Sequence, residues 1–313
     1  MDTASLNDPV EPLYDARLRG SVFISTVLEN RVHLHGGCWV APAGPGWMMV
    51  AFPKEFEGAD LVRQSGIFTL SLVAADDRSY QDQFFLGDQA ISARNHAEFL
   101  RAPSGSPVLR RAVAYLDIQG ARYWDLGDFI LAAGPVTAAQ ALRPEARNLT
   151  VNEIIASTDP RGVQDDTLPF KGFDFSTASL DPAPAERNPT ADLISTIYQH
   201  RAWGPFWVAA EEGSILTADV MQCSHRPPSM AIAVQSTTPA SAEITNLGGR
   251  FSLTIATSDT FIPQLVKRLP VARDGVAYFL CETRQTHHLA KAQLVVAEVT
   301  DWGWLNRPND RDG

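Results

Sequence analysis

The chain has 313 residues, of which 45% are hydrophobic and 20% charged, as is typical of a soluble globular protein with one large or two ordinary domains. The formal net charge of −10 disfavours a nucleic-acid partner. No long apolar run predicts a membrane span, the start MDTASLNDPVEP does not resemble a signal peptide, and the scattered Cys38, Cys223 and Cys281 indicate reduced thiols. We therefore expect a cytoplasmic protein.

Short strand-like segments dominate both halves of the chain. The first half has them at 22–28, 47–52, 68–73, 112–124 and 128–142, and the second half at 205–212, 230–234, 251–257, 275–286 and 292–305. Helices are expected at 55–66, which ends on Gly66, in parts of 76–100 and at 190–203. Strands without long alternating helices favour a closed or sandwiched β fold over a parallel α/β sheet.

Three segments of the first half recur in the second half in the same order. Residues 32–52 align without a gap with 214–234, residues 64–72 resemble 247–255, and residues 113–137 align without a gap with 276–300. Such an ordered set predicts a tandem duplication. We expect a first domain at 1–156, a linker at 157–189 that is rich in Pro, Asp and Ser, and a second domain at 190–313.

Short motifs recur at matching places in the two copies. The quoted motifs are Ser224-His225-Arg226-Pro227-Pro228 before MAIAV, Gly66-Ile67-Phe68, Gly249-Arg250-Phe251, Gly127-Asp128-Phe129 before Gly134-Pro135-Val136, and Ala297-Glu298-Val299. In this order they resemble the motifs of the flavin reductase-like FMN-binding split β-barrels. Phe129 stands where that family often has histidine, and the second copy keeps only the tail of this last motif.

The resemblance implies a mainly β chain with a few helices, built as two tandem split β-barrels. The family is usually a homodimer that binds FMN in a groove lined by both barrels. Two fused barrels would form that pair within one chain as an intramolecular pseudo-dimer, and a further homodimer stays open. The resemblance also implies FMN, or FAD as the alternative, with NAD(P)H as a transient co-substrate.

Candidate cofactor-binding residues in the second copy carry hydroxyl groups. Ser236, Thr237 and Thr238 follow the apolar strand, where the family's phosphate-binding position lies, and Thr217 and Ser224 would border the flavin ring. Hydroxyl and backbone N–H groups are suitable donors to a phosphate. The alternative interpretation is a Ser/Thr-rich loop that caps the next helix.

In the first copy, the candidate residues are Lys54, Gly36 and Gly37. Lys54 could pair with a phosphate, although Glu55 beside it opposes an anion. The two glycines would let the backbone approach a ligand closely, or they form a simple bulge or turn. Trp39 could stack on a ring, but a core position is the commoner role of such a tryptophan.

Other kinds of site receive less support. His33 and His35 share a face of an extended segment, but no Cys or carboxylate cluster completes a metal site, so none is expected. No nucleotide-binding GxGxxG follows a strand, and no residue nominates itself as a haem ligand.

The sequence therefore predicts an FMN-dependent oxidoreductase of the flavin reductase-like type. It would pass hydride from NAD(P)H to flavin or to a small organic substrate. No catalytic residue is assigned. Two alternatives stay open: a repurposed split-barrel biosynthetic enzyme that uses the groove for non-flavin chemistry, and a non-catalytic flavin-binding scaffold.

Overall fold

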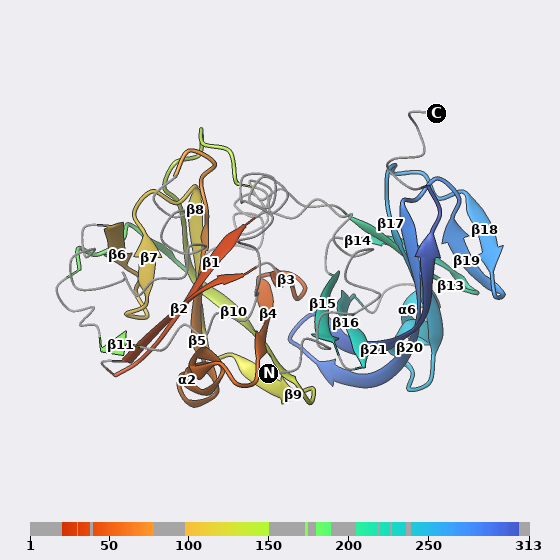
Figure 1. Ribbon diagram of the computed structural model, residues 1–313, viewed down its shortest axis with the longest axis horizontal. Helices are drawn as coiled ribbons and strands as arrows, with labels where there is room; N and C mark the ends of the chain where they lie inside the picture. The colour runs from red at the N-terminus through yellow and green to blue at the C-terminus, as the bar shows by residue number, and fades with distance from the viewer. Residues whose placement is uncertain are drawn as a thin grey trace, which may run out of the picture.

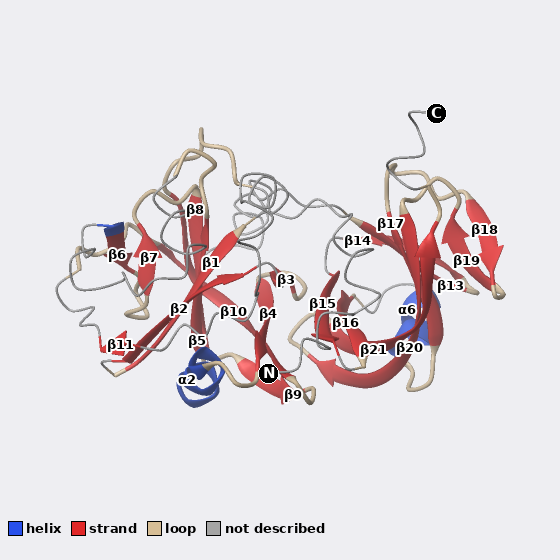
Figure 2. Ribbon diagram, in the orientation of Figure 1, coloured by secondary structure: helices blue, strands red, loops and turns tan. Residues whose placement is uncertain are grey.

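Two curled antiparallel sheets, one from each half of the chain, lie side by side (Figure 1). The computed structural model describes residues 21–29, 31–37, 40–77, 98–149, 173–174, 180–188, 205–217, 220–225, 227–235 and 239–306. Strands dominate these residues, and the described helices are short (Figure 2). The predicted mainly β class and the two tandem split barrels are thereby confirmed.

The first sheet has the strand order β11-β2-β1-β5-β8-β10-β4-β3, and β9 and β12 also pair with β10. Its main strands are β1 (Val22–Leu28), β2 (Arg31–Gly37), β3 (Val40–Pro42), β4 (Trp47–Pro53), β5 (Ile67–Leu72), β8 (Ala114–Gln119), β9 (Arg122–Asp125) and β10 (Phe129–Ala141).

The second sheet has the strand order β14-β13-β17-β20-β21-β16-β15. Its strands are β13 (Phe206–Ala210), β14 (Gly213–Thr217), β15 (Val220–His225), β16 (Pro228–Val234), β17 (Arg250–Ile255), β20 (Ala277–His288) and β21 (Gln293–Trp304).

The two sheets repeat one topology and, in their central strands, one register. Strands β2, β1, β5, β8, β10, β4 and β3 correspond in order to β14, β13, β17, β20, β21, β16 and β15. Residues that the gapless sequence alignment makes equivalent also pair equivalently. The matching pairs are Leu131–Ala51 with Leu294–Ala233, and Phe68–Ile118 with Phe251–Cys281. The duplication read from the sequence is therefore present in the hydrogen-bonding pattern.

Each barrel also carries a small hairpin between its third and fourth equivalent strands, which the sequence did not predict. These are β6 (Phe99–Arg101) with β7 (Pro107–Leu109), and β18 (Pro263–Val266) with β19 (Leu269–Ala272). Equivalent hydroxyl groups hold the hairpins to the sheets. Ser71 Oγ accepts the Leu109 N–H, and Thr254 Oγ1 accepts the Ala272 N–H, both at 3.2 Å.

The two barrels share a continuous apolar core. One buried cluster joins Met49, Leu131 and Ala133 of the first barrel to Met221 and Met230 of the second. Burial of this apolar surface holds the barrels together. The edge strands β3 and β4 lie next to β15, so the shared core lies between the ends of the two sheets (Figure 1).

Glycine decides two local boundaries. Helix α2 (Glu57–Ser65) ends where Gly66 takes the left-handed φ of 65°, as predicted for a glycine C-cap. The segment 112–124, expected as one strand, is broken at Gly120, whose φ is 76°, into β8 and β9. The equivalent segment of the second barrel has no glycine there and runs on as β20.

The described parts of the predicted linker lie along the first barrel. β11 (Phe173–Asp174) pairs with β2, and β12 (Glu186–Arg187) pairs with β10. Tyr115 Oη also donates to the Pro184 carbonyl at 2.8 Å. The proposed domain boundaries at 156 and 189, the expected helix at 190–203 and most of the segment 76–100 lie outside the described residues. Within the part that is described, no helix is long and apolar enough to cross a membrane.

Candidate functional site

The first polar contact between the barrels joins two of the predicted motifs. Ser224, near the end of β15, donates its hydroxyl proton to Asp128 Oδ1 at 2.7 Å. Ser224 comes from the Ser-x-x-Pro-Pro motif of the second copy, and Asp128 from the Gly-Asp motif of the first. Ser224 is almost fully buried, so this charge-assisted hydrogen bond is shielded from water. We call this contact the first seam.

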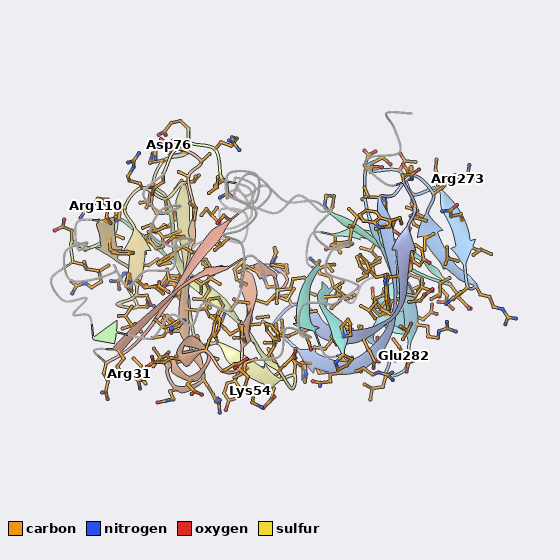
Figure 3. The ribbon with its side chains drawn as sticks, in the orientation of Figure 1. Arg31, Lys54, Asp76, Arg110, Arg273 and Glu282 are labelled. Atoms are coloured by element: carbon orange, nitrogen blue, oxygen red, sulfur yellow. The ribbon has the colours of Figure 1, made fainter. Side chains whose placement is uncertain are left out.

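Lys54 lies beside the first seam, at the edge of the first barrel (Figure 3). Its backbone N–H donates to the Asp128 carbonyl at 2.8 Å, and its Nζ lies 2.6 Å from Asp125 Oδ2. The Gly127 N–H donates to the other oxygen of Asp125 at 3.0 Å. The hydrogen bond from Lys54, followed by that from Gly127, lowers the pKa of Asp125. The lysine predicted as a phosphate partner is thus engaged by a carboxylate of its own barrel.

A second, equivalent contact lies where the strand β21 begins, and we call it the second seam. The buried Gly44 of the first barrel approaches Ala292 of the second so closely that a Cβ at position 44 would lie 2.7 Å from Ala292 Cβ. Gly44 also has a φ of 90°, which favours glycine. The second seam is therefore closed by direct apolar packing, whereas the first seam is closed by a hydrogen bond.

Aromatic rings meet between the two seams. The rings of Trp124 and His287 stack, with centroids 4.8 Å apart and an interplanar angle of 29°. Arg122 adds a hydrogen bond from Nη1 to the His288 carbonyl at 3.2 Å. Burial lowers the pKa of His287, which favours the neutral ring. An interface role for the His287-His288 pair, favoured by the sequence over catalysis, agrees with these contacts.

The predicted cofactor-binding residues do not form one cluster in the described structure. Ser224 pairs with Ser229 at the start of β16, and Gln235 follows the end of that strand. These ends are about 20 Å apart, since a strand rises about 3.3 Å per residue. Thr217 ends β14 and is half-buried. Gly36 and Gly37 end β2, opposite Phe23 and Val22, and Ser236, Thr237 and Thr238 lie outside the described residues.

One buried carboxylate is used for structure. Asp117 accepts hydrogen bonds from Thr69 Oγ1 at 2.7 Å and from the Ser104 hydroxyl and N–H at 2.6 and 2.9 Å. Burial raises the pKa of Asp117, and these hydrogen bonds act in the opposite direction. Because Ser104 lies in the turn between β6 and β7, Asp117 anchors that hairpin to the sheet.

The histidines considered for a metal do not form a metal site. His33 is buried against Phe56, with ring centroids 6.3 Å apart, and burial lowers its pKa to about 4. Among the residues that the structure describes, no group of three or more His, Cys, Asp or Glu side chains could hold a metal ion. Cys223 and Cys281 are free and buried, as expected for reduced thiols, and burial raises the pKa of both.

Comparison by sequence finds one relevant relative. No protein-family model matches the chain. A protein named as a diflavin flavoprotein from Synechocystis sp. is 30% identical over 139 residues, which are 41% of this chain and 22% of that protein. The match thus spans about a fifth of the relative's length.

Comparison by structure finds smaller proteins of which each match covers most. An NADH:FAD oxidoreductase from Streptomyces globisporus is 15% identical, with a TM-score of 0.41, over 46% of this chain and 89% of that one. An FMN-binding protein from Thermus thermophilus is 18% identical, with a TM-score of 0.36, over 43% and 79%. The chain is thus built as two tandem split β-barrels, the architecture for which its motifs resemble the flavin reductase-like FMN-binding proteins.

Proposed function

We propose that this chain is a flavin-binding oxidoreductase whose cofactor lies between its two barrels. The observation that carries the proposal is the pairing of two barrels of identical strand order through a shared apolar core. This pairing reproduces within one chain the arrangement that the resemblance implies for a groove lined by both barrels. The flavin relatives named above agree with this class of chemistry.

The residues at the seams fit an FMN in their chemistry. Thr217, with Ser236, Thr237 and Thr238 as the sequence-predicted partners, would donate hydrogen bonds to the phosphate and the polar ring edge. Gly36 and Gly37 would let the backbone approach a ring in the first barrel. Ser224 acts through its bond to Asp128, which holds the entry to β16 against the first barrel.

When bound, the flavin would supply two-electron chemistry by accepting a hydride from NAD(P)H. The reduced flavin would then pass these electrons to a free flavin or to a small organic substrate. The protein's part in this reaction is to hold both planar groups in contact and to exclude water.

Purified protein tests the proposal directly. We expect absorption bands near 370 and 450 nm, the usual bands of oxidised flavin, in the protein as isolated or after addition of FMN. NADH and NADPH oxidation, measured with and without added FMN or FAD, then separates an enzyme from a flavin-binding scaffold. A colourless protein that fails to bind either flavin would contradict the proposal.

One observation favours a second candidate function. Phe129 stands where the family often has histidine, and it is 93% buried in the core shared by the barrels, since only 7% of it is exposed. A phenylalanine at this position transfers no proton. If no flavin binds, we expect a repurposed split barrel that acts on a small molecule without flavin, and a screen for non-flavin ligands by thermal shift would test it.

A further inference from the structure

Two equivalent turns face the opposite barrel, and their backbones are alike. In the first barrel, the Leu126 N–H donates to the Phe129 carbonyl at 2.9 Å. In the second barrel, the Leu289 N–H donates to the Ala292 carbonyl at the same distance. The gapless alignment of 113–137 with 276–300 makes these turns equivalent. They therefore differ in their side chains and not in their path.

The charges on the two turns are opposite. The first turn contains Asp128 and follows Asp125, whereas the equivalent positions of the second barrel are Lys291 and His288. At the first turn, the ammonium group of Lys54 is neutralised by Asp125, and Asp128 is held by Ser224. At the second turn, Lys291 is exposed and stands next to the buried Ala292 at the start of β21.

The local field at the two seams should therefore differ in sign. Two carboxylates within a few residues of each other disfavour a phosphate at the first seam. A lysine beside Gln235, which follows the strand β16 that pairs with β21, favours a phosphate at the second seam. The equivalent sites have thus diverged in the property that matters most for an anionic cofactor.

We propose that the chain binds one flavin rather than two, with its phosphate at the second seam and Lys291 as its cationic partner. The first seam serves as a structural joint in which Ser224 and Asp128 fasten the barrels together. This inference rests on the proposed function, and it adds the number of cofactors, their place and a binding residue.

Titration of the full chain with FMN tests the inference, with flavin fluorescence as the readout and the equivalent lysines as matched variants. We expect one FMN per chain and roughly tenfold or more weaker binding by Lys291→Ala, since a charge-assisted hydrogen bond is lost. Lys291→Arg should restore most of the affinity. Lys54→Ala should change the affinity by about twofold or less, because its charge is already paired at the surface.

The outcomes separate this inference from the proposed function. Two FMN molecules per chain, an unchanged affinity of Lys291→Ala, or a larger loss in Lys54→Ala than in Lys291→Ala would each overturn the inference and leave flavin binding intact. Absence of any flavin binding to the unaltered protein would instead overturn the proposed function. Both lysine side chains are exposed, so urea unfolding of each variant should match that of the unaltered chain.

Discussion

Trp124 and His287 hold equivalent positions in the two copies, and their rings stack on each other with centroids 4.8 Å apart. In a symmetric dimer, a residue meets its own counterpart only at the twofold axis. The stacked pair therefore marks an approximate twofold axis between the barrels. The Ser224–Asp128 and Gly44–Ala292 contacts lie at equivalent places on either side of it.

Removing the ring at this axis should loosen the contact between the barrels. We expect Trp124→Ala to lower the free energy of unfolding by about 1–3 kcal/mol, from lost burial and lost stacking. Urea unfolding, followed by circular dichroism, measures the change. Tyr123→Ala is the control, because Tyr123 is next to Trp124 on β9 but 48% exposed, and a loss as large as that of Trp124→Ala would contradict a special role for the stack.

The Ser224–Asp128 hydrogen bond should couple the two barrels energetically. We expect Ser224→Ala and Asp128→Asn each to destabilise the chain, and the double variant to lose less than the sum of the two. The coupling energy should be about 1–2 kcal/mol, as for a shielded hydrogen bond to a charged group. A double-mutant cycle by urea unfolding measures it, and strictly additive losses would show that the contact does not form in solution.

Two glycines with similar φ separate backbone strain from steric contact. Gly44 has a φ of 90° and would place a Cβ 2.7 Å from Ala292 Cβ, whereas Gly127 has a φ of 94° and no atom within 4 Å of its Cβ position. Gly127→Ala should cost about 1 kcal/mol, from the backbone alone. Gly44→Ala should cost about 2–4 kcal/mol, because overpacking adds to the strain.

A compensating change tests the steric part of this prediction. Ala292→Gly in the Gly44→Ala background removes the atom that the new methyl group would meet, so part of the loss should be recovered. The free energies of unfolding of the four variants are compared under one condition. Equal losses for Gly44→Ala and Gly127→Ala would contradict close packing at the second seam.

The buried His33 should make the stability of the chain depend on pH. Burial lowers its pKa in the folded state from 6.5 to about 4, so the unfolded chain binds the proton more tightly. The stabilising contribution is therefore complete above about pH 6.5 and is lost as the pH falls from 6.5 to about 4. Its size is about 3 kcal/mol, at 1.36 kcal/mol for each unit of pKa.

The variant His33→Gln isolates this contribution from that of the carboxylates. We expect the free energy of unfolding of the unaltered chain to fall more steeply between pH 7 and pH 4.5 than that of the variant. Urea unfolding at several pH values gives both slopes. Because the comparison uses slopes, a constant cost of burying glutamine does not affect it, and parallel slopes would refute the shifted pKa of His33.

Periodicity and repetition predicted much of the fold. Alternating apolar residues marked β1, β4, β5 and β17, and Gly66 marked the end of α2, because these signals depend on residues close together in the chain. The hairpins β6–β7 and β18–β19 were missed, since each is held by a hydroxyl group from a distant strand. The break at Gly120 was missed because one glycine within a strand pattern does not reveal its φ.

The candidate site divides in the same way. The alignment of the two copies identified Ser224, Asp128, Lys54 and the two turns as members of matching motifs, and this depended on sequence alone. The sequence contained no sign that Ser224 of one copy would bind Asp128 of the other, or that Lys54 would be neutralised by Asp125. Those partners were decided only when the shared apolar core brought the barrels together, because hydrogen bonds and ion pairs act over a few ångströms while the residues lie up to 96 positions apart in the chain.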